Sequence, residues 1–306
     1  MNQPFLRQEL MTPGHLACAG CGAALGMRYA LGALGPKTIV VIPAGCWSTF
    51  IGTYPYSCLT VPVMSVAFAT TAATASGIKA GLEVLGRDDE TVLAWAGDGG
   101  TFDIGIQALS GAAERNDDII FVCYDNEAYM NTGIQRSSAT PEGTVTTTTP
   151  ASAPKRQKKK DIVAIMAAHG VPYAATASIA YPEDFMAKLA KAKAIKGTKF
   201  IHLFTPCPTG WRHEPHLTVE IAAKAVASRV FPLYEVFEGV RWRLSSMPEK
   251  EAVTDYLQHQ GRFKNMPFQV REAFQKTVDD NWQRLQEKCA EPKSGFNREK
   301  APDSAA

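Results

Sequence analysis

The chain has 306 residues and a formal net charge of +2. This near-neutral charge gives no overall electrostatic reason to bind nucleic acid. No apolar run approaches the roughly 18 residues that a membrane span requires, and residues 1–10 lack the apolar core of a signal peptide. Seven cysteines, an odd number, argue against a secreted disulfide scaffold. We therefore expect a cytoplasmic protein without nucleic-acid or membrane partners.

Helical and apolar extended patterns alternate along the first 230 residues. The pattern predicts helices over residues 22–34, 70–85, 103–115, 161–169, 182–194 and 218–228. It predicts strands over residues 38–43, 62–67, 91–96, 119–124, 173–177 and 199–204. Residues 137–152, rich in Thr, Ser and Pro, predict an active-site loop, either ordered or mobile. This alternation is typical of an α/β fold with a doubly wound, mostly parallel sheet.

The C-terminal part of the chain has a different character. From Phe231 onward the apolar content falls, and amphipathic helices are predicted over residues 249–258 and 267–289. We expect an α/β domain over residues 1–230, a helical extension over 231–290 that packs on partner subunits, and a disordered tail over 291–306.

Polar residues follow two neighbouring predicted strands. Asp98, within Gly97-Asp-Gly-Gly100, comes after the first strand. Asn126 comes after the second, and 26 residues (100–125) separate it from Gly99. Open α/β sheets bind ligands beyond the carboxyl ends of their strands. Magnesium prefers oxygen ligands that it shares with phosphates, and Gly97, Gly99 and Gly100 let the backbone approach a diphosphate. Two ordinary turns are the simpler explanation, but the strand context favours a metal–diphosphate site.

Four of the cysteines form a second pattern. Cys18 and Cys21 lie on one turn, while Cys46 and Cys207 each follow an apolar strand. If the strands run parallel, these thiols lie at the same sheet edge as Asp98. Four thiolates suit either tetrahedral zinc or a [4Fe–4S] cube, and the spacing alone does not separate them.

Both patterns together resemble a known family. Residues 97–141 and the cysteine segments are similar to the beta, thiamine diphosphate-binding subunit of 2-oxoacid:ferredoxin oxidoreductases, such as pyruvate:ferredoxin oxidoreductase, over most of residues 12–240. The resemblance implies a thiamine diphosphate-binding fold of the PP-domain type. It implies magnesium bound by Asp98, Asn126 and the Ala128 carbonyl, and one [4Fe–4S] cluster bound by Cys18, Cys21, Cys46 and Cys207.

The resemblance also implies further site residues. Asn131 would lie beside the thiazolium ring where the 2-oxoacid reacts, and Thr132 beside the cofactor. Gly45 and His15 would contribute to cofactor binding, although His15 could equally support the neighbouring metal site. Glu127, between two proposed magnesium ligands, is expected to face outward, and Asp103 to be an ordinary helix carboxylate.

The family reaction is the oxidative decarboxylation of a 2-oxoacid, usually to acyl-coenzyme A and carbon dioxide, with electrons passed through the cluster to ferredoxin or another acceptor. The resemblance implies an alpha subunit that supplies the pyrimidine-binding domain and the activating glutamate. Gamma and ferredoxin-like delta subunits, or equivalents, would carry the distal clusters, because this chain has no Cys-x-x-Cys-x-x-Cys run. The isolated chain is expected to be inactive.

Alternatives stay open at this point. A noncatalytic, zinc-stabilised α/β module that binds a nucleotide would also explain the cysteines, whereas the four-cysteine set disfavours a nonoxidative thiamine decarboxylase. Residues 46–54 depart from the Cys-Leu-Glu-like run of pyruvate enzymes, so phenylglyoxylate, indolepyruvate and oxalate are possible substrates. The basic run of residues 155–160 is interpreted as a solvated loop; a second interpretation is a patch that attracts an acidic electron carrier or coenzyme A.

Overall fold

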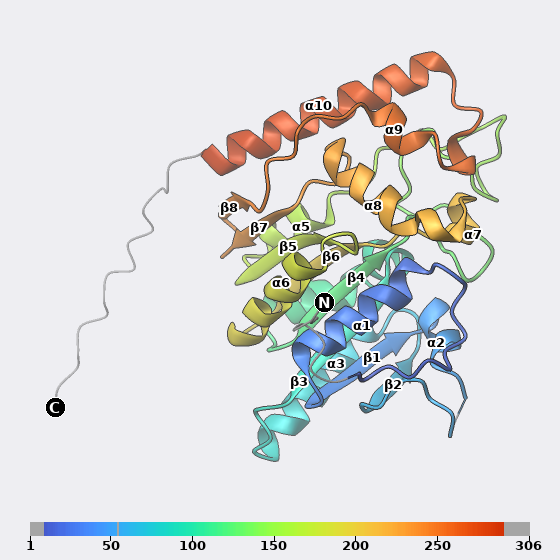
Figure 1. The fold of residues 1–306 in the computed structure, drawn as a ribbon. Coiled ribbons are helices and arrows are strands. Elements are labelled where there is room, and N and C mark those ends of the chain that lie inside the picture. Colours follow the sequence, from blue (N-terminus) through green and yellow to red (C-terminus); the bar gives the residue numbers. More distant parts are fainter. Residues whose placement is uncertain (1–8, 54, 291–306) are drawn as a thin grey trace, which may run out of the picture.

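The computed structural model describes residues 9–53 and 55–290 (Figure 1). One sheet has the strand order β2-β1-β3-β4-β6-β5-β7-β8. The strands are β1 (Thr38–Pro43), β2 (Val63–Val66), β3 (Thr91–Gly97), β4 (Ile120–Asp125), β5 (Tyr173–Ser178), β6 (Lys199–Phe204), β7 (Tyr234–Phe237) and β8 (Arg241–Leu244). The pairings among β1 to β6 are parallel, while β7 pairs antiparallel with both β5 and β8.

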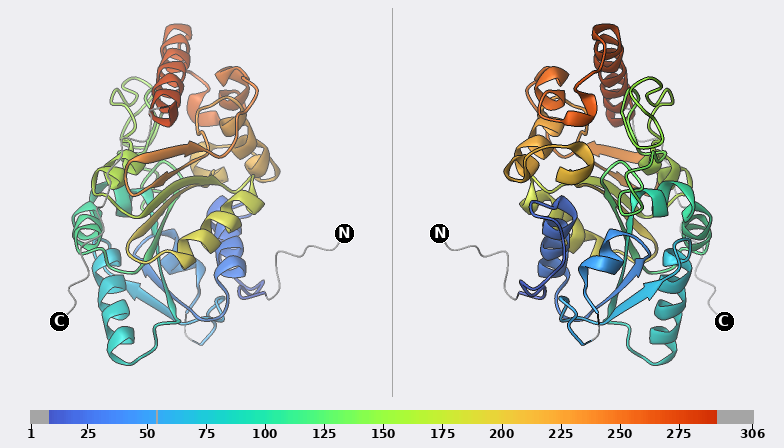
Figure 2. Two further views of the ribbon diagram at one scale, coloured as in Figure 1. Left: turned by 90° about the vertical axis from the view of Figure 1, so that its left-hand side faces the viewer. Right: turned by 90° about the vertical axis from the view of Figure 1, so that its right-hand side faces the viewer.

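Helices cover both faces of this sheet (Figure 2). The α-helices are α1 (Gly22–Leu34), α2 (Cys46–Phe50), α3 (Thr71–Val84), α4 (Ile106–Glu114), α5 (Ile162–Ala168), α6 (Pro182–Ala194), α7 (Pro208–Trp211), α8 (Thr218–Ala227), α9 (Val253–Leu257) and α10 (Phe268–Ala290). Shorter turns of other helix types span Gly99–Asp103, Pro215–Leu217 and Gly261–Phe263. Among the described residues, no helix combines the length and the apolar composition needed to cross a membrane.

The alternating direction of side chains along the strands creates two cores. In β3, Leu93 and Trp95 pack with residues of α1, α6 and α8, while Ala94 and Ala96 pack with residues of α3, α4 and α5. Because both faces are covered, the central strands are apolar throughout rather than alternating. The predicted doubly wound, mostly parallel α/β sheet is confirmed.

Two predicted features of the chain are corrected. The predicted helix over residues 103–115 is divided into the turn Gly99–Asp103 and α4, so Asp103 precedes the helix. The extension over residues 231–290 is not purely helical, because β7 and β8 continue the main sheet beyond residue 230. Both strands have only four residues, and β8, at the edge of the sheet, alternates arginine with apolar residues, so they carry little of the apolar signal that marks a buried strand.

The remaining C-terminal segments are helical as expected, with α9 shorter than predicted. Helix α10 packs on β8 of the same chain, where Lys288 Nζ lies 4.2 Å from the centroid of the Trp242 ring. The tail predicted over residues 291–306 lies outside the described residues.

Candidate active site

Four neighbouring strands of the sheet end at one edge and carry the predicted site residues. Strands β1, β3, β4 and β6 are adjacent and parallel. Their carboxyl ends lead directly into Cys46, Asp98, Asn126 and Cys207. The structure thus brings the two sequence patterns to the same edge, as the parallel order requires.

The three predicted magnesium ligands are in contact. One terminal atom of the Asn126 amide lies 3.0 Å from both Asp98 Oδ1 and the Ala128 carbonyl oxygen. With the amide oxygen at this position, three acceptors converge, and only a cation makes that arrangement favourable. With the amide turned over, its nitrogen takes this position and donates to both oxygens. Trp211 Nε1 donates to the Asn126 carbonyl oxygen at 2.7 Å and fixes this loop. The donor set fits magnesium.

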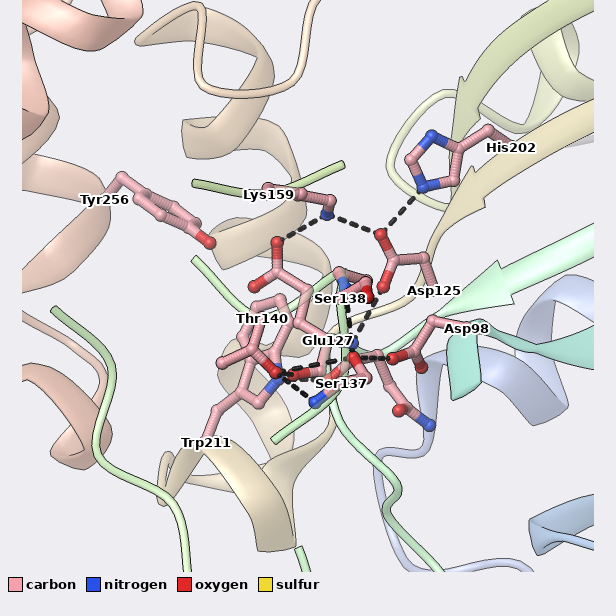
Figure 3. A network of polar contacts seen from close by, with 12 residues as sticks. Asp98, Asp125, Glu127, Ser137, Ser138, Thr140, Lys159, His202, Trp211 and Tyr256 are labelled. Atoms are coloured by element: carbon pink, nitrogen blue, oxygen red, sulfur yellow. Dashed lines mark hydrogen bonds and ion pairs between the residues drawn. The ribbon is translucent and has the colours of Figure 1, made fainter. Parts of the chain in front are cut away.

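The environment of Asp98 also fits a cation. Asp98 is 1% exposed, and its Oδ2 accepts a hydrogen bond from Ser137 Oγ at 2.5 Å (Figure 3). Burial, and then the nearby Asp125 carboxylate, raise the pKa of Asp98 well above its usual range. A carboxylate that is unfavourable as a buried anion gains more than an exposed one from a neighbouring divalent cation.

The glycines around Asp98 permit close packing of the loop. A Cβ at Gly99 would lie 2.5 Å from the ring of Tyr129, and one at Gly100 would lie 3.1 Å from the ring of Phe68. At Gly99, contact within the protein is therefore already sufficient reason for a residue without a side chain.

The four predicted cluster cysteines line one cavity of about 170 Å³, together with Asn126 and Asn131. Within residues 9–53 and 55–290, no group of three or more His, Cys, Asp or Glu side chains is arranged to hold a single metal ion. Zinc would need all four sulfurs at about 2.3 Å from one point. A four-iron cube takes one thiolate at each iron, so it needs four thiols spread around it.

The thiols in this cavity act on one another electrostatically. Burial, and then the neighbouring Cys207, Cys21 and Cys18 in that order, raise the pKa of Cys46 to about 12. Burial also raises the pKa of Cys207 to about 12, with Cys21 and Cys18 contributing. These groups become thiolates at neutral pH only when a bound metal supplies compensating positive charge.

Hydrogen bonds fasten the turn of Cys18 and Cys21 both to the loop that carries Cys207 and to the start of α8. Gly22 N donates to the Pro206 carbonyl at 3.3 Å, and Thr218 Oγ1 donates to the Gly20 carbonyl at 2.7 Å. Gly20 has φ +70°, and a Cβ there would lie 2.3 Å from the Pro215 carbonyl oxygen. Only glycine therefore fits this turn without displacing its neighbours.

Of the other predicted site residues, one lines the four-thiol cavity and three do not. Asn131 is exposed and lines the four-thiol cavity. Thr132 Oγ1 instead donates to Gln135 Oε1 at 2.6 Å, and His15 Nδ1 accepts from Ala17 N at 3.3 Å. Gly45 precedes α2, and a Cβ there would lie 3.5 Å from the Tyr124 hydroxyl. Thr132, His15 and Gly45 do not line the cavity, and their roles stay predictions.

The expectation that Glu127 faces outward is wrong. Its side chain is buried and contacts Lys159 at 2.8 Å and Arg262 at 2.7 Å. The alternation on which the expectation rested applies to extended backbone, whereas Glu127 lies past the end of β4 with φ 62°. The sequence offered one signal, an acidic residue between two proposed ligands, but nothing that identified its partners.

The interpretation of residues 155–160 as a solvated loop is also wrong for two of its lysines. Lys155 is 2% exposed, and Lys159 bridges Asp125 and Glu127 (Figure 3). Burial alone would lower the pKa of Lys159, but these two carboxylates raise it above its ordinary value. His202 Nε2 contacts the same Asp125 at 2.7 Å. The basic run thus supplies the buried Lys155 and the partly buried Lys159, which pairs with carboxylates next to Asn126.

Asp103 is more than an ordinary helix carboxylate. Its Oδ2 accepts hydrogen bonds from the Tyr129 hydroxyl at 2.9 Å and from Ser138 N at 3.0 Å. In the same loop, Thr140 Oγ1 donates to the Glu127 carbonyl at 2.6 Å. These bonds hold the loop of residues 137–152 against residues 126–128, which carry two of the proposed magnesium ligands and are called the metal loop below.

A thiamine diphosphate-binding domain is the class that this fold and site define. The family described as thiamine pyrophosphate enzyme, C-terminal TPP binding domain, matches residues 43–203. The ketoisovalerate oxidoreductase subunit VorB of Pyrococcus horikoshii is 52% identical over 294 residues, covering 92% of this chain and 93% of that protein. The pyruvate synthase subunit PorB of Methanothermobacter thermautotrophicus is 49% identical over 282 residues, covering 91% and 98% respectively.

A solved structure agrees in fold. The 2-oxoglutarate:ferredoxin oxidoreductase from Magnetococcus marinus matches with a TM-score of 0.55 and 22% identity, over 73% of this chain and 84% of that one. The chain belongs to the thiamine pyrophosphate enzymes and, within them, to the beta subunits of the 2-oxoacid:ferredoxin oxidoreductases. It is thus one subunit of an oxidoreductase.

Proposed function

We propose that this chain is the catalytic subunit of an enzyme that oxidatively decarboxylates a 2-oxoacid, usually to acyl-coenzyme A, and passes the electrons through a [4Fe–4S] cluster to ferredoxin or another acceptor. One observation carries the proposal. Asn126 contacts the proposed magnesium ligands Asp98 and Ala128, and it also lines the four-thiol cavity. A diphosphate site and a cluster site that share a residue offer electrons a short path.

The residues have separable tasks in this proposal. When bound, thiamine diphosphate supplies the carbon nucleophile and the electron sink. Asp98, Asn126 and the Ala128 carbonyl would hold its magnesium. Ser137 occupies the second carboxylate oxygen of Asp98, which leaves Oδ1 directed at Asn126. Asn131, on the wall of the four-thiol cavity, would lie beside the thiazolium ring, where its amide can hydrogen-bond to the 2-oxoacid.

Substrate and partners follow from the relatives. Their names specify ketoisovalerate and pyruvate, so we propose an aliphatic 2-oxoacid ahead of phenylglyoxylate, indolepyruvate or oxalate. We further propose a cytoplasmic complex in which an alpha subunit supplies the pyrimidine-binding domain and the activating glutamate, with gamma and delta subunits carrying further clusters. Dye reduction by the purified complex with a panel of 2-oxoacids, with and without coenzyme A, identifies the substrate.

Metal analysis distinguishes this proposal from a zinc-stabilised module. The complex, purified without oxygen, is expected to contain four iron and four sulfide per cluster in this subunit, together with thiamine diphosphate. Zinc without iron would overturn the proposal.

The magnesium assignment has its own test. Asp98→Asn removes the charged ligand, so magnesium-dependent binding of thiamine diphosphate should be lost in calorimetric titrations. Asp118→Asn is the matched control, because Asp118 pairs with Lys199 at the opposite end of the strands. Equal cofactor affinity in the two variants would contradict the assignment.

A further inference from the structure

Arg262 is an arginine buried in the C-terminal part of the chain. It lies in the turn Gly261–Phe263 and is 2% exposed. Its Nη2 lies 2.7 Å from Glu127 Oε2, a charge pair rather than an aligned hydrogen bond, because Oε2 has no hydrogen-bond partner. Its guanidinium carbon lies 3.6 Å from the centroid of the Trp211 ring. The cation is thus held between a carboxylate and an aromatic face.

These two partners belong to different cofactor loops. Glu127 lies between Asn126 and Ala128, the proposed magnesium ligands. Trp211 ends α7, the helix that begins directly after Cys207. Trp211 Nε1 also donates to the Asn126 carbonyl oxygen. Arg262 therefore contacts both the metal loop and residues 207–211, called the cluster loop, at the point where the two meet.

Neighbouring contacts fix the position of Arg262 itself. Its Nε donates to Gln260 Oε1 at 2.9 Å, and its Nη2 donates to the Tyr256 hydroxyl at 3.1 Å. Gly261 N donates to the Arg212 carbonyl at 3.1 Å, and the Arg262 carbonyl accepts from Val145 N at 3.3 Å. Contacts with Tyr256 and Gln260, close to it in sequence, thus orient the side chain.

The metal loop needs such a support. Glu127 has φ 62°, a conformation that is unfavourable for a residue with a side chain and that persists only when its surroundings hold it. This conformation turns the backbone so that the Asn126 side chain and the Ala128 carbonyl face the same point. Lys159 holds one carboxylate oxygen of Glu127, and Arg262 holds the other.

We propose that Arg262 is a positioning residue that holds the metal loop through Glu127 and the cluster loop through Trp211. It thereby fixes the position of the two cofactor sites relative to each other. The proposal rests on the function proposed above. Residues that orient metal ligands from behind typically change metal affinity or activity roughly 10- to 100-fold when they are replaced.

The chain contains a matched control for the Glu127 partner. Glu235 is also 2% exposed and also pairs with one lysine, Lys191, and one arginine, Arg243, but it lies on β7 and outside the cofactor loops. Glu127→Gln and Glu235→Gln therefore remove the same charge from equally buried carboxylates, with the difference that Arg243 is 64% exposed and Arg262 is buried.

The test uses the whole complex. Magnesium-dependent affinity for thiamine diphosphate is measured by calorimetry, iron per chain by chemical analysis, and the unfolding midpoint by urea titration. Glu127→Gln should weaken the affinity roughly 10- to 100-fold and retain iron. Arg262→Met should weaken the affinity and also lower iron, because it loses both partners. Glu235→Gln should lose stability and stay within about twofold of the wild-type affinity.

Arg262→Lys keeps the charge but not the planar stack, and it should recover magnesium-dependent affinity better than iron. If Arg262→Met does not assemble, Glu127→Gln and Arg262→Lys still decide the question. Lower stability of both glutamine variants with unchanged cofactor affinity would show a purely structural pair and overturn the inference. A wild-type complex without iron or thiamine diphosphate would instead overturn the proposed function.

Discussion

Replacing Gly20 by alanine tests the turn that presents Cys18 and Cys21. The new Cβ would lie 2.3 Å from the Pro215 carbonyl oxygen, at a residue with φ +70°. Two other glycines serve to separate the steric effect of an added Cβ from the effect of the left-handed backbone. Gly86 has φ +67° with nothing within 4 Å of a Cβ, and Gly14 has free space and no positive φ.

The expected losses of stability differ by variant. Left-handed backbone costs about 1–2 kcal/mol for a residue with a Cβ, which is the expectation for Gly86→Ala. Gly20→Ala adds a steric conflict of the kind that costs about 1–3 kcal/mol, so its total is about 2–5 kcal/mol. Gly14→Ala should stay within about 0.5 kcal/mol of the wild type.

The assay combines urea unfolding with iron and sulfide analysis of the complex purified without oxygen. Gly20→Ala should lose iron, because relief of the conflict moves the turn away from the Cys207 loop. Gly86→Ala should lose stability and keep its iron. A Gly20→Ala complex with full iron and a wild-type urea midpoint would refute the reasoning.

Two further predictions concern Cys207 and Glu235. Cys207→Ser should lose the absorbance and iron of this subunit's cluster, while Cys289→Ser in α10 keeps both; a wild-type iron content in the first variant would rule out Cys207 as a ligand. Burial would raise the pKa of Glu235, but hydrogen bonds from Lys191, Arg243 and Tyr173 lower it to about 2. A carboxyl group whose pKa is lowered by folding stabilises the folded state at any pH above its ordinary pKa. This contribution is at most about 3 kcal/mol, and less because solvent screens Arg243, and it is lost as the pH falls towards 2. Glu235→Gln should therefore make the urea midpoint depend less on pH between about pH 5 and 2. Parallel curves of midpoint against pH for the variant and the wild type would contradict this.

Much of the site could be predicted from sequence because its residues follow strands. Asp98, Asn126, Cys46 and Cys207 each come just after a buried apolar run, and parallel topology then brings them to one edge. The helices at residues 22–34 and 182–194 have the predicted bounds for a similar reason, since their periodic apolar faces pack on that sheet.

The parts that escaped prediction depend on contacts distant in sequence. Glu127 is buried because Lys159 and Arg262 approach it, and no local pattern around Glu127 indicates either partner. Strands β7 and β8 are short and charged, and they form because β5 offers an edge to pair with. Side-chain periodicity reports which face of an element is buried, but not what lies opposite.

The four thiols around the cavity come from widely separated parts of the chain. During synthesis, Cys18 leaves the ribosome long before Cys207, and in the sheet β3 and β4 lie between β1 and β6, the strands that lead to Cys46 and Cys207. The proposed cluster can therefore be bound by all four thiols only when this part of the sheet is in place. Cys18 is the most exposed of the four, so an incoming iron–sulfur carrier would reach this thiol first.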